Sequence, residues 1–292
     1  MKHIDRQSQP PGSSLRLHPL DFEILREIIH EKSGIYFQDN KRPALESRVL
    51  PRLKALSITC FEDYIAYATH PANYREILRL IDCVTPIHSR FFNGQTQFAC
   101  IADQIIPSIV KQKKAAGARK IKIWCTACAT GEEAFSLAMI FMSSPMAYDP
   151  DISLEIIGSD INTEALYIAE CGQYDEKAIS AIPEAYQEAY VRKTPAGYKL
   201  ADQILDMVTF KRINLSDRTD MMRMHEIDFV LCANVLYLLS PDVKQNLLQA
   251  IYNCLNDEGY LMLGTNETLF GLPHPFLEIQ TDSVRVYQKS QG

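Results

Sequence analysis

The sequence predicts an α/β fold with two parts: a small all-helical N-terminal domain, followed by a Rossmann-like, doubly wound domain. From His18 to about Phe92, apolar residues recur at helical spacing. From Ile121 onward, apolar runs typical of buried parallel strands alternate with amphipathic helices. The 292 residues are 47% hydrophobic and 23% charged, which is ordinary for a globular protein of one or two domains.

The N-terminal part divides into a tail and a helical domain. Residues 1–16 are polar and contain Pro, Gly and Ser, which predicts a disordered tail. Residues 17–94 are expected to form the helical domain, with a kink or a break at Pro51. Its four helices are predicted from apolar faces, which span Phe22–Ile29, Ala44–Leu56, Phe61–Tyr67 and Tyr74–Ile81.

The stretch Ile121–Met142, IKIWCTACATGEEAFSLAMIFM, opens the second domain. It begins as an apolar run, passes through a turn of small residues that ends at Gly131, and continues as an apolar helix face. A linker helix over residues 95–118, interrupted at Pro107, precedes it. Strand, tight turn and helix form the first unit of a doubly wound sheet, in which ligands bind at the carboxyl ends of the strands.

The turn also indicates the class of ligand. It has neither G-x-G-x-x-G nor a P-loop, and Glu132 and Glu133 follow it, so a phosphate would be repelled. Asp160 ends the next predicted strand, where an acid accepts hydrogen bonds from ribose hydroxyls. S-adenosylmethionine, which carries a sulfonium, an ammonium and a ribose diol, fits this pattern. The structural alternative is that both glutamates only interact with the helix dipole and that Asp160 is an N-cap.

The remaining elements continue the α/β alternation. Helices are predicted over 163–171, 175–191 (two, split at Pro183) and 241–255. Strands are predicted over 198–200, 207–213, 227–232 and 259–264, and a terminal hairpin is predicted from 276–279 and 283–288. The second domain is therefore expected to span 119–292.

Composition excludes several classes of function. The net charge of −6 argues against a general nucleic-acid binder. No apolar run approaches about 20 residues and no apolar signal core is present, so we expect a cytoplasmic protein without membrane insertion. Cys125 and Cys128 form a single C-x-x-C without a second pair or a nearby His pair, so no metal site is predicted. The missing glycine fingerprint argues against a nicotinamide-dependent oxidoreductase.

Several ordered motifs together resemble the chemotaxis receptor methyltransferases (the CheR family). IWCTACATGEEAFSLAM is similar to that family's IWSAGCSTGEEPYSLAM, and GSDINTEALYIAECGQY to ATDIDTEVLEKARSGIY. The family also has counterparts of VTPIHSRFFNGQTQF, INLSD, DFVLCANVLYLLS and GYLMLGTNETL. The resemblance extends from about Leu20 through nearly the whole chain. The resemblance implies a protein-glutamate O-methyltransferase that uses S-adenosylmethionine, with a small antiparallel β-subdomain at about 190–213.

The resemblance also implies site residues. Glu132 would contact the amino acid part of the cofactor, Asp160 the ribose, and Asn214 and Leu215 the adenine. The full set of implied cofactor-binding residues is Ser89, Asn93, Ala127, Glu132, Asp160, Asn214, Leu215, Asn234 and Val235. Arg90 and Tyr237 are the candidate catalytic residues, beside the acceptor carboxylate.

Some positions depart from the family pattern. An amide of the family is Ile87 here, its F-F-R-E arginine is Asn93, its C-R-N-V arginine is Ala233 and its I-Y-F-D tyrosine is Leu238. Two functions therefore remain open. One is an active methyltransferase on chemoreceptor glutamates or a related signalling protein. The other is a catalytically impaired regulatory or scaffold protein that binds S-adenosylmethionine or S-adenosylhomocysteine.

The expected partner is an acidic helical methylation region of a chemoreceptor. Five cations and one acid lie between Lys41 and Lys54, and Arg48, Arg52 and Lys54 are the candidate docking residues. The short turn at Lys193–Gly197 predicts that a receptor C-terminal pentapeptide does not tether the enzyme. We expect a monomer.

Overall fold

The computed structural model describes residues 15–281 and 284–290, so most of the predicted tail lies outside the described residues. The described chain forms two compact units. The first contains residues up to 31 together with 36–84, and the second contains residues 32–35 and 85 onward. The second unit thus includes a four-residue segment from early in the sequence.

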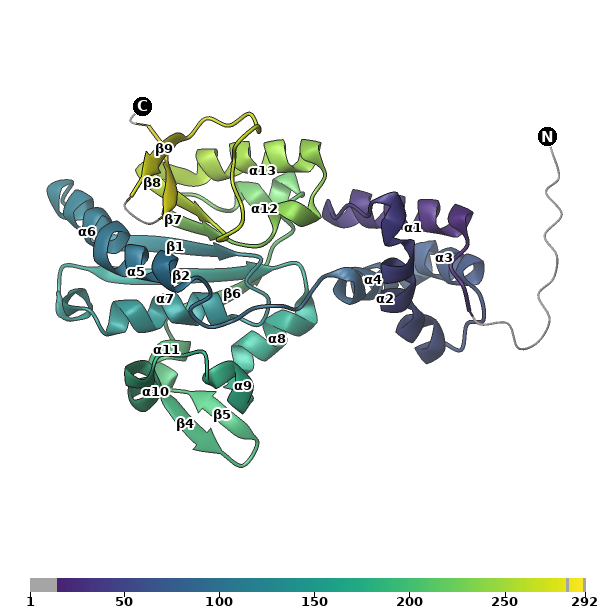
Figure 1. Ribbon diagram of the computed structural model, residues 1–292, viewed down its shortest axis with the longest axis horizontal. Helices are drawn as coiled ribbons and strands as arrows, with labels where there is room; N and C mark the ends of the chain where they lie inside the picture. Colours follow the sequence, from purple (N-terminus) through teal and green to yellow (C-terminus); the bar gives the residue numbers. More distant parts are fainter. Residues whose placement is uncertain (1–14, 282–283, 291–292) are drawn as a thin grey trace. The chain divides into compact units, whose positions relative to one another are not determined.

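The first unit is helical, as predicted. Its helices are α1 (Pro19–Ser33), α2 (Arg42–Ala55), α3 (Phe61–Thr69) and α4 (Tyr74–Val84), with short 3-10 turns η1 (Asp39–Lys41) and η2 (Pro71–Asn73) (Figure 1). Its core consists of fully buried apolar side chains, among them Leu25, Leu45 and Leu80. Pro51 lies inside α2 without ending it.

The second unit is built on a seven-stranded sheet in the order β6-β2-β1-β7-β8-β10-β9. The strands are β1 (Lys120–Thr126), β2 (Ser153–Asp160), β6 (Val208–Arg212), β7 (Ile227–Cys232), β8 (Leu255–Leu263), β9 (Leu277–Gln280) and β10 (Arg285–Gln288). Strands β6, β2, β1, β7 and β8 pair in parallel, whereas β10 pairs antiparallel with β8 and with β9. The predicted doubly wound sheet and terminal hairpin are therefore confirmed.

Helices cover both faces of this sheet (Figure 1). On one face lie α7 (Glu132–Met142) and α8 (Thr163–Cys171), and on the other lie α12 (Arg218–Met222) and α13 (Pro241–Cys254). The side chains of β1 alternate between the two cores: Ile121 and Ile123 pack with α7, and Trp124 packs with α13. This period of two explains why the run Ile123–Cys125 in β1 is continuously apolar.

A second, small sheet has the order β3-β5-β4, from β3 (Gln173–Tyr174), β4 (Val191–Thr194) and β5 (Gly197–Leu200). The antiparallel subdomain was predicted to extend to residue 213, but the strand expected over 207–213 is β6 of the large sheet, where it pairs with β2. Short helices surround the small sheet: α9 (Glu176–Ile179), α10 (Glu184–Tyr190) and α11 (Asp202–Leu205).

The predicted linker helix is interrupted, but the interruption lies before Pro107 rather than at it. It consists of α5 (Gln95–Cys100), the π-helical turn η3 (Ile101–Ile105) and α6 (Ile106–Ala115). The wider turn precedes Pro107, which lies in the first turn of α6, where a missing N–H is tolerated. The 3-10 turns η4 (Pro145–Tyr148) and η5 (Leu236–Leu238) complete the unit.

Candidate cofactor-binding and active site

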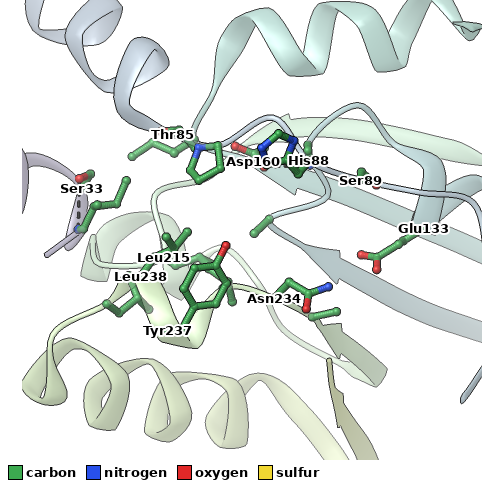
Figure 2. Close-up of a pocket in the computed structure, with 18 of the residues that line it drawn as sticks. Ser33, Thr85, His88, Ser89, Glu133, Asp160, Leu215, Asn234, Tyr237 and Leu238 are labelled. Atoms are coloured by element: carbon green, nitrogen blue, oxygen red, sulfur yellow. Dashed lines mark hydrogen bonds between the residues drawn. The ribbon is translucent and has the colours of Figure 1, made fainter. Parts of the chain in front are cut away.

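A pocket of about 360 Å³ lies in the second unit, at the carboxyl ends of the parallel strands (Figure 2). Residues that follow β1, β2, β6 and β7 line it, as the position of ligands in doubly wound sheets predicts. The predicted residues in its lining are Ser89, Arg90, Asn93, Ala127, Asp160, Asn214, Leu215, Asn234, Val235 and Tyr237. Of the eleven predicted cofactor-binding and catalytic residues, only Glu132 is not in the lining, and these residues make up ten of its 22 positions.

The turn after β1 forms one wall through tight backbone geometry. Ala127 and Ala129, both in the lining, have φ values of 48° and 46°, and Gly131 has 90°. A Cβ on Gly131 would lie 2.9 Å from the Cβ of Ala169, so packing requires glycine here. The N–H of Cys128 bonds the carbonyl of Ser159 at 2.9 Å, which ties the turn to the end of β2.

Asp160 is held rigidly where the prediction placed it. Its Oδ2 accepts the N–H of Ala129 at 2.9 Å, and its Oδ1 accepts the N–H of Asn162 at 2.8 Å. The N-cap of α8 is Asn162, whose Oδ1 accepts the N–H of Ala165. Asp160 is therefore a pocket carboxylate fixed by the neighbouring turn, and the alternative that it caps the helix is wrong.

Of the two acids after the turn, Glu133 lines the pocket and Glu132 does not. The carboxylate of Glu132 turns back to Thr130, whose Oγ1 lies 2.7 and 2.9 Å from its two oxygens. Successive residues of a helix point about 100° apart, so only one of the two can face the pocket. The predicted cofactor contact of Glu132 does not fit this arrangement, because Glu133 and not Glu132 occupies the pocket wall.

Burial raises the pKa of Glu133 to about 7, although a hydrogen bond from Asn93 opposes this shift. The neighbouring charges of Glu132 and Glu267 raise its pKa further. Burial also raises the pKa of Glu132, which the hydroxyl of Thr130 partly offsets. The pocket thus contains a carboxyl group that changes charge close to neutral pH and that a bound cation would stabilise in its ionised form.

The floor of the pocket depends on a residue that the sequence analysis missed. Asn234 and Val235 line the pocket after β7, and Asn234 has a φ of 58°. The carboxylate of Glu267 accepts the N–H groups of Asn234 at 2.7 Å, Leu236 at 2.9 Å and Gly264 at 3.1 Å. An acid three residues after the predicted strand Gly259–Gly264 was the available signal.

Exposed polar side chains line the mouth of the pocket. Arg90 and His88 are exposed lining residues, and Tyr237, on η5, is 64% exposed. Figure 2 shows the ring of Tyr237 pointing into the pocket from the side opposite Asp160 and His88. Leu238 also lines the pocket. Both candidate catalytic residues are therefore in the lining.

Two of the three predicted docking cations are used inside the helical unit. Arg52 forms two hydrogen bonds with the carboxylate of Glu76, at 2.9 and 2.7 Å. Arg48 donates to the carbonyl of Val84 at 2.6 Å and lies over the ring of Phe37. These contacts hold the helices of the unit together, so Arg48 and Arg52 have a structural role, whereas Lys54 is exposed. Docking of a partner by these cations stays a prediction.

The C-x-x-C pair packs in the core. Cys125 and Cys128 are fully buried, and burial raises the pKa of both thiols, which disfavours the reactive thiolate. Among residues 15–281 and 284–290, no group of three or more His, Cys, Asp or Glu side chains is arranged to hold a metal ion. No helix in this part of the chain is long and apolar enough to cross a membrane.

Comparisons with known proteins agree with the motifs. Residues 88–285 match the family model "CheR methyltransferase, SAM binding domain", and residues 20–85 match "CheR methyltransferase, all-alpha domain". Chemotaxis protein methyltransferase 2 of Vibrio cholerae serotype O1 is 26% identical over 273 residues, covering 93% of this chain and 91% of that protein. Chemotaxis protein methyltransferase 1 of Pseudomonas aeruginosa is 27% identical over 273 residues, covering 92% and 97%. The chain belongs to the CheR methyltransferase family.

Proposed function

We propose that this protein transfers a methyl group from S-adenosylmethionine to glutamate side-chain carboxylates of a chemoreceptor. The observation that carries this function is the pocket itself. In a chain of the CheR family, it places the carboxylates of Asp160 and Glu133 at the carboxyl ends of the parallel strands. The chemotaxis methyltransferases that resemble this chain over more than nine-tenths of its length support the same activity.

The donor set of the pocket suits S-adenosylmethionine. We infer that Asp160 accepts hydrogen bonds from the ribose hydroxyls, since backbone N–H groups fix its orientation at the wall. Glu133 would pair with the ammonium group, which lowers the pKa of this buried carboxyl toward its usual value. Leu215 and Val235 would lie against apolar parts of the cofactor, with Asn234 in the floor.

The reaction requires orientation more than acid–base catalysis. A glutamate acceptor is already ionised near neutral pH. When bound, S-adenosylmethionine supplies a methyl group on a sulfonium, which is an activated leaving group. The protein's task is to hold the acceptor oxygen in line with that methyl group and to exclude water. We infer that Arg90 binds the acceptor carboxylate and that the hydroxyl of Tyr237 orients it, because both are exposed residues of the pocket lining.

We further propose that the acceptor glutamates lie on an acidic helical region of the receptor, and that the exposed Lys54 of the helical unit helps to bind this region. We propose that the enzyme is a cytoplasmic monomer. Tethering by a C-terminal receptor pentapeptide is not expected. Only Pro195 and Ala196 connect β4 and β5, so no extended loop is present between these strands to hold such a peptide. Measurable binding of an isolated receptor-tail pentapeptide would contradict this.

Calorimetric titration with S-adenosylhomocysteine tests the pocket. We expect low-micromolar binding that Asp160→Ala abolishes, followed by labelled-methyl transfer to receptor fragments whose acceptor glutamates are intact. Fragments with these glutamates changed to glutamine are the matched control. Cofactor binding without any methyl transfer would favour a regulatory protein of the same fold, and no binding at millimolar ligand would overturn the proposed function.

A further inference from the structure

The segment Lys32–Ile35 is part of the second unit, although about 50 residues that belong to the helical unit separate it from the rest of that unit. Ser33 and Ile35 line the pocket, and Ile35 forms an antiparallel bridge with Leu239. Both Ile35 and Leu239 are buried. Figure 2 shows Ser33 at one end of the pocket and Glu133 at the other. The segment therefore closes the end away from Glu133.

The side chain of Asn214 is used to hold this segment. Its Nδ2 donates to the backbone carbonyl of Lys32 at 2.9 Å. Its Oδ1 accepts from the N–H of Ser216 at 3.1 Å and from the Ser216 hydroxyl at 2.8 Å. Because both ends of the amide already have partners, the side chain has one N–H left for a ligand. Its predicted contact with adenine is therefore secondary to a positioning role.

Gly34 fixes the path of the same segment. Its φ is 72°, a conformation that L-residues with a side chain rarely adopt. A Cβ at this position would lie 2.9 Å from the Cβ of Ser216 and 2.9 Å from Cγ1 of Val243. The backbone thus passes too close to Ser216 and Val243 for any residue but glycine. Asn214 and Gly34 thus fix the segment at two points, the carbonyl of Lys32 and the Cα of Gly34.

We propose that Lys32–Ile35 is a fixed wall of the cofactor pocket, and that Asn214 is the positioning residue that holds it against the adenosine end. This inference rests on the proposed function. Pairing Glu133 with the ammonium group places the amino acid part of the cofactor at that end of the pocket, and hence the adenosine at the end closed by Lys32–Ile35. A preformed wall lowers the ordering cost of binding, so releasing it reduces cofactor affinity. The effect falls on the KM for S-adenosylmethionine, because the methyl group reacts elsewhere in the pocket.

Gly34→Val in the full chain tests the wall, with Gly117→Val as the matched control. Gly117 has nearly the same φ, 67°, but nothing lies within 4 Å of an added Cβ, so only the backbone strain is shared. We expect Gly34→Val to raise the Kd of S-adenosylhomocysteine and the KM for S-adenosylmethionine about tenfold, with kcat within about twofold. Gly117→Val should leave all three values near those of the wild type.

Asn214→Asp is a milder second variant, because it keeps the acceptor for Ser216 and replaces the donor to Lys32 with an oxygen. Asn253→Asp, on the exposed face of α13, makes the same change of charge as a control. Hydrogen exchange in a peptide covering residues 30–36 should accelerate in Asn214→Asp and stay slow in Asn253→Asp. The affinity for S-adenosylhomocysteine should fall at least about fivefold only in the former.

The outcomes separate the two proposals. Wild-type affinity within twofold in both Gly34→Val and Asn214→Asp would overturn the wall, while leaving the methyltransferase assignment intact. Lower affinity with unchanged exchange at 30–36 would also overturn it, because the segment would not have moved. A wild-type protein that does not bind S-adenosylhomocysteine would overturn the proposed function, and the wall with it.

Discussion

Glu267 binds the backbone N–H of Asn234 at 2.7 Å, and this contact joins the loop after β7 to the loop after β8. The same carboxylate accepts the N–H groups of Leu236 and Gly264. Gly264 must approach closely for this, since an added Cβ would lie 2.9 Å from the Asn234 nitrogen. One acidic side chain thereby fixes the floor of the cofactor pocket without lining it.

Glu267→Gln should therefore lower both stability and cofactor affinity. The variant replaces a charged acceptor by an amide whose NH₂ faces backbone donors, and each lost charged hydrogen bond costs about 1.5–3 kcal/mol. We expect the free energy of unfolding to fall by about that amount in urea titrations. Glu278→Gln is the control, because Glu278 forms an exposed ion pair with Arg285 that contributes little. Equal effects of the two variants would contradict the anchoring role.

We expect Glu133 to make cofactor binding depend on pH. Its pKa is raised to about 7 in the folded protein, and the ammonium of the ligand requires the ionised form. The affinity for S-adenosylhomocysteine should rise about tenfold per pH unit below pH 7 and level off above it. Calorimetry between pH 5.5 and 8.5 measures this. Glu133→Gln should flatten the profile, whereas Glu132→Gln should retain it; the reverse would show that Glu132 is the ligand.

The same group affects stability in the opposite direction. The folded-state pKa of Glu133 lies above the value of 4.5 that applies when the chain is unfolded. Between about pH 4.5 and 7 the folded state therefore binds more protons than the unfolded state, so this group's contribution to stability falls as pH rises. Bound ligand should remove this loss. A Glu133→Gln protein without ligand should show less decline in Tm across this window than the wild type.

Arg52 is expected to be structural rather than a docking residue. Its partner Glu76 is 4% exposed, so removing Arg52 leaves a buried carboxylate with the hydroxyl of Tyr64 but without a counter-charge, which costs roughly 3 kcal/mol. Arg52→Ala should lower the unfolding midpoint of the helical unit. Lys54→Glu reverses an exposed charge and should change stability by less than about 0.5 kcal/mol. Because Lys54→Glu leaves stability nearly unchanged, weaker receptor binding in this variant would be due to lost docking. The difference from the wild type should shrink as the salt concentration rises.

Local patterns predicted the sheet and much of the pocket for physical reasons. The apolar run of β1 required burial on both faces, and Asp160 was recognised because it ends a strand. The sequence could not decide between Glu132 and Glu133, because two adjacent acids at a helix start differ only in rotation about its axis. The structural role of Arg52 was not predicted, because its partner Glu76 lies 24 residues away.

Long-range contacts account for the remaining gaps. Lys32 and Asn214 are 182 residues apart, and no local pattern links a helix C-terminus to a loop at that distance. Glu267 reaches back 33 residues to Asn234, so its role emerges only when β7 and β8 lie side by side. Gly34 directly follows α1, and only the fold shows that its lack of a side chain is required by Ser216 and Val243.

Arg90 is the residue through which acceptor binding can be separated from cofactor binding. It lines the pocket mouth and is exposed, whereas Glu133 and Asp160 are buried deeper. Arg90→Ala should raise the KM for a receptor fragment by about tenfold or more, because a charged hydrogen bond to the acceptor contributes about 1.5–3 kcal/mol. The Kd of S-adenosylhomocysteine should stay within about twofold of the wild type.

Arg90→Lys distinguishes charge from geometry at the same position. Lysine keeps the charge but cannot bind a carboxylate through two parallel N–H groups, so it should restore only part of the acceptor affinity. Arg119→Ala, which removes an exposed arginine paired with Asp151, is the matched control and should leave the KM for the receptor fragment unchanged. An Arg90→Ala enzyme with wild-type KM would show that another cation holds the acceptor, and His88, exposed in the same lining, would be the next residue to change.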